Sequence, residues 1–242
     1  MPVYTLTILV AAALVLWVYQ HDRYEREPWW AVLLAVAVGF GAMWLIGFAD
    51  DGAMRWLAPA RGNLAGKAVV VALIEEVGKL ITILLLARVI LARQFNDPMD
   101  GLIYGRLVGL GMAVEESLLY LSLAPANIET LGVEVVRLFA HSLMAGLIGF
   151  AIGLGCAPAR RCDATVPAPR CRPYPGLVVA CLLLSTLLHF GWNVIAYARP
   201  DALVAKLIPM MVMLALMVTW RWLCTVAETR SRAIFDPPLA AA

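Results

Sequence analysis

Residues 100–120 read DGLIYGRLVGLGMAVEESLLY, a largely apolar run whose length decides the fold class. A helix of about 20 residues crosses roughly 30 Å of hydrocarbon, so this run predicts a membrane-spanning helix. Gly101, Gly105 and Gly109 form a stripe of small residues that permits close contact with another helix. Glu116 follows Gly109 by seven residues and falls on the same face. We therefore expect the Glu116 side chain to point into a helix bundle.

The rest of the chain has the same character. Of its 242 residues, 62% are hydrophobic and 15% are charged, whereas soluble domains have roughly 45–50% and about 25%. This composition excludes an ordinary soluble fold. A net charge of +2, with basic residues scattered over loops, also argues against a nucleic-acid partner.

The apolar runs predict an all-α, polytopic integral membrane bundle of about seven helices. Their expected positions are about 3–19, 29–49, 67–91, 101–123, 134–155, 176–198 and 203–224. Residues 1–225 would form one transmembrane domain, and 226–242 a polar cytoplasmic tail. Lys and Arg are more frequent in alternate loops, which predicts an external N-terminus and a cytoplasmic C-terminus.

The chain has five cysteines. Cys181 and Cys224 lie in apolar runs, whereas Cys156, Cys162 and Cys171 share one loop and match no zinc-binding or CxxC spacing. We expect all of them to be unbridged thiols, because the predicted orientation places that loop in a reducing compartment.

Ionisable side chains inside hydrocarbon cost a few kcal/mol each, so each requires a partner or a function. Here they concentrate in the four middle spans. They are Glu75, Glu76 and Lys79 in the third, Arg106, Glu115 and Glu116 in the fourth, Arg137 and His141 in the fifth, and His189, with the polar Asn193, in the sixth.

Helix geometry relates these side chains to one another. Lys79 lies one turn after the Glu75 and Glu76 pair and can neutralise part of its charge. Because consecutive spans run in opposite directions, Glu75, Glu116, His141 and His189 fall at one depth, in the predicted outer half of the membrane. A shared depth favours one site over scattered structural ion pairs.

Two carboxylates and two imidazoles around one cavity suit the activation of water for amide hydrolysis. A carboxylate would take the proton of water, and an imidazole or the Asn193 amide would stabilise the oxyanion. A second reading is a His₂Glu zinc site built from His141, His189 and either Glu75 or Glu116, although the chain has no HExxH motif.

Five segments, in this order, resemble the motifs of the PrsW family of intramembrane proteases, glutamic-type peptidases distantly related to the CAAX prenyl endopeptidases. They are HDRYEREPWW (21–30), EEVGK (75–79), DGLIYGRLVGLGMAVEESLLY (100–120), RLFAHSLMAGLIG (137–149) and LLHFGWN (187–193). Two positions differ from the usual pattern, since Met112 stands where Phe is frequent and Ser117 where Asn is frequent.

The resemblance implies roles for individual residues. Glu75 and Glu76 occupy the paired-glutamate motif with Lys79 at its basic position, and the later motifs supply Glu116, His141, His189 and Asn193. It also implies a bacterial cytoplasmic (inner) membrane and a membrane-anchored protein substrate, as in site-1 cleavage of an anti-sigma factor.

The sequence therefore predicts an intramembrane endopeptidase in which Glu75 or Glu76 is the general base. Glu116 and Lys79 would tune that carboxylate, and Ser117 and Arg137 would support the site. We expect no cofactor beyond the zinc alternative, and the sequence assigns no oligomeric state. Two other functions stay open, a proton-coupled transporter and a non-catalytic membrane binding module that uses the same residues.

Overall fold

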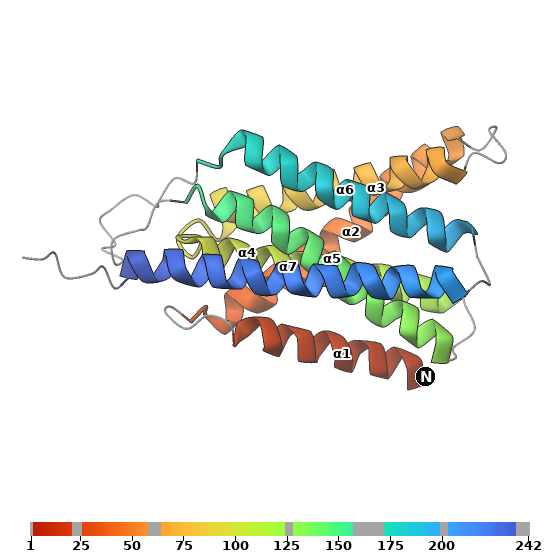
Figure 1. The fold of residues 1–242 in the computed structure, drawn as a ribbon, viewed down its shortest axis with the longest axis horizontal. Helices are drawn as coiled ribbons and strands as arrows, with labels where there is room; N and C mark the ends of the chain where they lie inside the picture. Colours follow the sequence, from red (N-terminus) through yellow and green to blue (C-terminus); the bar gives the residue numbers. More distant parts are fainter. Residues whose placement is uncertain are drawn as a thin grey trace, which may run out of the picture.

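The computed structural model describes residues 2–20, 26–57, 64–123, 128–156, 172–198 and 203–235. Within these ranges the chain forms seven α-helices and no strand, which confirms the all-α fold class. The helices are α1 (Pro2–Tyr19), α2 (Trp29–Leu57), α3 (Leu64–Leu85), α4 (Pro98–Leu123), α5 (Ile128–Gly153), α6 (Pro175–Ala198) and α7 (Leu203–Phe235), with a π-helical turn at Leu86–Ile90 after α3. They lie along one long axis, and α4 and α5 occupy the middle of the bundle (Figure 1).

Glycines allow α4 to pack closely against α5. A Cβ atom on Gly101 would clash with the backbone of Gly149 and Gly153, and one on Gly109 would clash with the backbone of His141. The predicted stripe therefore does face another helix. Its antiparallel register continues beyond Gly109 and brings Glu116 to the level of Arg137 and His141.

The start of α4 is fixed by two aspartates that satisfy its first backbone donors. Asp97 Oδ1 accepts the N–H groups of Met99 (2.6 Å) and Asp100 (2.9 Å), while Asp100 Oδ2 accepts those of Asn96 (2.6 Å) and Asp97 (2.9 Å). This reciprocal capping, with Pro98 as the first helical residue, fixes where α4 begins. The start of α4 in turn fixes where Glu116 lies further along the helix.

Three of the described helices contain segments both long and apolar enough to cross a membrane, at Trp29–Trp56, Leu131–Gly153 and Pro175–Ala196. Val3–Tyr19 is apolar but shorter. The helices α3 and α4 contain buried charged side chains, which are Glu75, Glu76 and Lys79 in α3 and Asp100 and Arg106 in α4. Seven membrane crossings and an external N-terminus remain predictions.

Three helices extend well beyond the ranges that the sequence indicated. The α2 helix ends at Leu57 rather than near 49, so Asp50 is helical. The α5 helix begins at Ile128 rather than near 134, and α7 ends at Phe235 rather than near 224. Cys181 and Cys224 are free thiols as predicted. The prediction for Cys156 was wrong, because it is disulfide-bonded, and its partner lies outside the described residues, as do Cys162 and Cys171.

Candidate active site

The predicted glutamates and histidines converge in the interior of the bundle. Glu75 and Glu76 come from α3, Glu116 from α4, His141 from α5 and His189 from α6. Of these five, only Glu116 has a side chain more than one-tenth exposed, at 13%. Segments as far apart in sequence as residues 75 and 189 thus form one cluster.

Glu76 is the anchored member of the glutamate pair. It is fully buried and forms an ion pair with Lys79, also fully buried, one turn later on α3. The same oxygen, Oε1, lies 2.8 Å from Nδ1 of His189. Because an ionised carboxylate can only accept, Nδ1 of His189 donates to Glu76, and this contact turns Nε2 of the ring toward the centre of the cluster.

Glu75 is the member that faces the centre of the cluster. Its Oε2 atom lies 3.7 Å from Nε2 of His189 and 4.0 Å from Nε2 of His141. This oxygen is buried and has no hydrogen-bond partner among the described residues. A buried carboxylate oxygen without a hydrogen-bond partner, beside two imidazole nitrogens, can accept a hydrogen bond from a bound group or contact a cation.

Glu116 and Arg137 border the cluster on the other side. Glu116 Oε2 lies 3.2 Å from Nε2 of His141, and its Oε1 lies 3.5 Å from Nε of Arg137. Arg137 also pairs with Glu134 one turn earlier on α5 and stacks over the ring of Tyr120 at 4.4 Å. Arg137 is therefore held by three side chains and fixes Glu116 in turn.

The α6 helix presents Ser185, His189 and Asn193 at successive turns of one face. Ser185 donates to the carbonyl of Met144 on α5 (3.3 Å) and fixes α6 against α5. Asn193 is 7% exposed, and its Nδ2 has no hydrogen-bond partner among the described residues. An amide donor is thus available one turn beyond His189.

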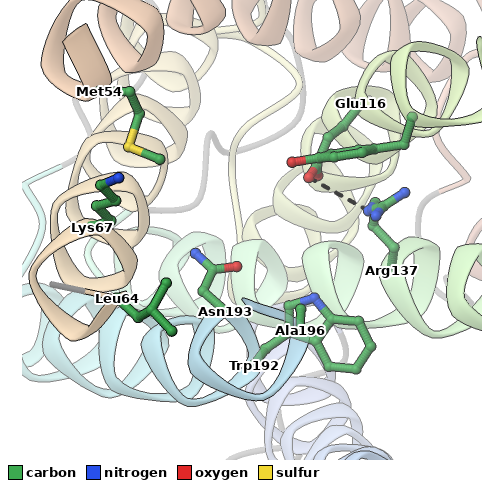
Figure 2. A pocket seen from close by; sticks show the side chains of 9 residues that line it. Met54, Leu64, Lys67, Glu116, Arg137, Trp192, Asn193 and Ala196 are labelled. Carbon is green, nitrogen blue, oxygen red and sulfur yellow. Dashed lines mark ion pairs between the residues drawn. The ribbon is translucent and has the colours of Figure 1, made fainter. Parts of the chain in front are cut away.

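A cleft of about 460 Å³ lies beside the cluster. Its walls come from the end of α2, the start of α3, the second half of α4, and parts of α5 and α6. The lining side chains are Met54, Leu64, Lys67, Glu116, Tyr120, Arg137, Trp192, Asn193 and Ala196. In Figure 2, Lys67 stands on one wall, the Glu116 and Arg137 ion pair on the opposite wall, and Asn193 between them. The cleft therefore gives access to the cluster from one end of the bundle.

Three of the clustered residues bring donor atoms of the kind that bind metal ions close to one another. One donor atom each from Glu75, His141 and His189 lie within 4.8 Å of one another. His₂Glu is a donor set that catalytic zinc uses, and tetrahedral ligands at about 2.0–2.2 Å from zinc are separated by roughly 3.4 Å. The hydrogen bond from His189 Nδ1 to Glu76 is the outer contact that metal-binding histidines commonly make. The donor chemistry fits a divalent cation.

The remaining candidates lie at the margin of the cluster or outside it. Ser117 is fully buried, but its hydroxyl has no partner among the described residues. Arg106 lies between the rings of Trp17 (4.5 Å) and Trp220 (3.7 Å), and its Nε donates to Ser142 (3.1 Å).

Asp50 is a polar residue near the site that the sequence does not single out. It follows the predicted second span, but it lies in α2, where Oδ1 is buried without a hydrogen-bond partner among the described residues. Its charge interacts with Glu116 and Glu75. One feature of the sequence could have indicated this position. Asp50 precedes Met54 by four residues, so in a continuous helix both lie on the same face, and Met54 lines the cleft.

A helical, largely apolar bundle with a buried group of glutamates and histidines beside a cleft is compatible with a membrane-embedded hydrolase. Comparison with known proteins narrows the class. Residues 27–220 match the family described as PrsW family intramembrane metalloprotease, which covers more than half of the chain. The chain belongs to the PrsW family of intramembrane proteases.

A named relative agrees with this membership. Protease PrsW of Geobacillus kaustophilus (strain HTA426) is 30% identical over 145 residues, which amount to 58% of this chain and 61% of the relative. The matched part thus spans less than two thirds of that relative's length. No solved structure matches the chain.

Proposed function

We propose that this protein is an endopeptidase that hydrolyses a peptide bond of a membrane-anchored protein, with a glutamate activating the attacking water. One observation carries the proposal. Glu75 Oε2 is buried and unpaired among the described residues, and it faces the Nε2 atoms of both His189 and His141. This centre is rich in acceptors and lies beside a cleft, so it suits a water molecule bound next to a substrate.

In the proposed mechanism Glu75 accepts a proton from water as the water oxygen attacks the scissile carbonyl. The Asn193 amide donates to the oxyanion that develops, because its Nδ2 is unpaired among the described residues and beside the cleft. Glu75 then passes the proton to the departing amine, which completes hydrolysis. Glu76 and Lys79 hold His189 in place, and Glu116 holds His141.

The family description implies a metal, and the donor set fits one. When bound, a divalent ion such as zinc supplies Lewis-acid polarisation of the scissile carbonyl. Glu75, His141 and His189 would hold it. Glu116, 3.2 Å from His141, would remain the carboxylate outside that set and could take the base role.

The substrate class follows from the position of the cleft. The cleft lies at the end of the bundle where α3 begins and α6 ends, which the charge distribution predicts to be extracytoplasmic. We therefore propose a substrate with an anchor in a bacterial cytoplasmic membrane and a cleavage position near its outer surface, such as a regulatory protein cleaved at a first site.

A transporter is less well supported than a peptidase. Alternating access requires the site to open toward both ends of the bundle. Between α4 and α5, on the far side of the cluster, Gly101 and Gly105 are in backbone contact with Gly149 and Gly153. This packing leaves no space for a path between the two helices.

The test is cleavage by purified protein in lipid vesicles. Quenched fluorescent peptides, each with one apolar membrane segment and varied flanking residues, would be presented to wild-type protein and to Glu75→Gln. We expect cleavage by the wild type and loss of cleavage in the variant. Equal turnover by both proteins would refute the role of Glu75, and proton flux without cleavage would favour the transporter.

A further inference from the structure

Lys67 stands out among the residues of the cleft because nothing in the site uses it. It is the fourth residue of α3, it is half-buried, and it lines the cleft. Figure 2 shows its side chain on the wall opposite Glu116 and Arg137. Its place at the start of α3 puts it nearer the mouth of the cleft than Glu75.

The other charges of the cleft are already paired. Arg137 contacts Glu134 and Glu116, and Glu116 also contacts His141. Lys67 makes no ion pair or hydrogen bond with any described residue. Asp50, which does not line the cleft, is repelled by Glu116 and Asp51 and makes no ion pair with Lys67 in the described part of the chain. The ammonium group of Lys67 is therefore the cation of this cleft that a ligand can use.

Asn193 supplies a second unpaired donor in the same cleft. Its side chain is more than nine-tenths buried, and Nδ2 lacks a partner among the described residues. In Figure 2 the amide lies between the Lys67 wall and the Glu116 wall. Two donors without partners in the described part of the chain match a ligand that presents acceptor oxygens, with negative charge toward Lys67.

The spacing between Lys67 and Glu75 along α3 gives the distance of Lys67 from the reacting bond. Lys67 precedes Glu75 by eight residues, which is about 12 Å along a helix. An extended peptide advances about 3.3–3.6 Å per residue, so roughly three to four residues cover this distance. We propose that Lys67 is a specificity-determining residue that binds an acidic side chain of the substrate, three or four residues from the scissile bond toward the mouth of the cleft. This inference rests on the proposed peptidase function.

The experiment uses peptides with one apolar membrane segment that differ only at the position three or four residues from the cleavage position, where they carry Asp, Asn or Lys. Cleavage would be measured in phosphatidylcholine vesicles, which carry no net charge and so do not select between the peptides. The proteins would be the wild type, Lys67→Met, Lys67→Glu and the control Arg55→Met. Arg55 is exposed, lies at the same end of the bundle and does not line the cleft.

We expect the wild type and Arg55→Met to cleave the Asp peptide about tenfold faster than the Lys peptide, which corresponds to about 1.4 kcal/mol. Lys67→Met should remove the preference, and Lys67→Glu should reverse it. An unchanged preference in Lys67→Met would overturn the inference, as would an equal loss for all three peptides, which would indicate a structural role.

A binding measurement separates this inference from the proposed function. Photo-crosslinking of the same peptides to Glu75→Gln reports the preference without turnover, and we expect the order Asp, Asn, Lys there too. Retained cleavage with no preference among the peptides would refute the role of Lys67 alone. Absence of cleavage by the wild type, with no crosslink to any peptide, would refute both proposals.

Discussion

Nδ1 of His189 lies 2.8 Å from Oε1 of Glu76, and this contact gives the two adjacent glutamates different surroundings. Glu76 is occupied by His189 and Lys79, so its charge is compensated and its position is fixed. Glu75, the preceding residue on α3, points its Oε2 toward the Nε2 atoms of both histidines and keeps that oxygen unpaired among the described residues. Adjacent residues of one type thus receive different environments from the helices packed around them.

Glu75→Gln should remove cleavage while leaving the fold intact. The amide keeps the shape of the side chain but cannot take a proton from water, and general-base catalysis contributes typically about 10²–10⁴-fold. We expect a loss of cleavage rate in that range with an unchanged melting temperature in detergent. A variant that retains the wild-type rate would contradict the assignment of Glu75.

Glu76→Gln should lower stability as well as activity. It leaves the fully buried Lys79 ammonium without its counter-ion, and breaking a buried pair costs about 3–5 kcal/mol. The double variant Glu76→Gln/Lys79→Met removes both charges, so it should recover most of the melting temperature without recovering cleavage. If the double variant were as unstable as the single one, the ion pair would not be the source of the stability.

Asn193→Ala should lower kcat much more than it raises KM. In the proposed mechanism the Asn193 amide donates to the oxyanion that forms in the transition state, and removal of one such donor costs about 10²–10³-fold in kcat. Steady-state cleavage of a peptide in vesicles would measure both constants. A rise in KM at constant kcat would show instead that Asn193 binds the ground state.

Gly105→Ala should destabilise the bundle and disturb Glu116. A Cβ atom there would lie 2.5 Å from the carbonyl oxygen of Ala145 and 3.0 Å from the Cα of Gly149, so α4 and α5 would have to separate. Overpacking of this kind costs typically about 1–3 kcal/mol, and displacement of Glu116 from His141 should lower cleavage. Gly47→Ala is the matched control, because no atom lies within 4 Å of its added Cβ. Equal behaviour of the two variants would argue against the role of this contact.

Metal content separates the two proposed roles of Glu75, because a carboxylate that holds a metal ion through its inward-facing oxygen is not also the base that activates water. Should elemental analysis find zinc in purified wild-type protein, we expect the double variant His141→Ala/His189→Ala to lack it, because two of the three donors are then gone. Equal, low metal content in both proteins would exclude this site for zinc. Cleavage would then be measured before and after removal of metal with a chelator. Cleavage that survives chelation assigns water activation to Glu75, and cleavage that is lost assigns it to Glu116 beside the bound ion.

The residues of the site are conspicuous in the sequence because they lie in membrane-spanning runs. A glutamate or histidine inside an apolar run is costly, so Glu75, Glu116, His141 and His189 stand out by their positions in the chain alone. Asp50 does not stand out, because it lies where a span is expected to end, and Lys67 reads only as a basic residue near a span boundary. The end of an apolar run does not mark the end of a helix when the helix continues beyond that run, as α2 does.

The sequence by itself determined the all-helical apolar bundle, the close-packing face of α4 and the shared depth of the buried polar residues, since these depend on helical periodicity and on the cost of burying charge. Only the tertiary structure decided which glutamate is anchored and which keeps an oxygen without a hydrogen-bond partner among the described residues. That difference depends on the rotation of α3 about its axis relative to α5 and α6, which carry His141 and His189. The side chains that meet across helices are set by packing, and periodicity within one helix does not contain that information.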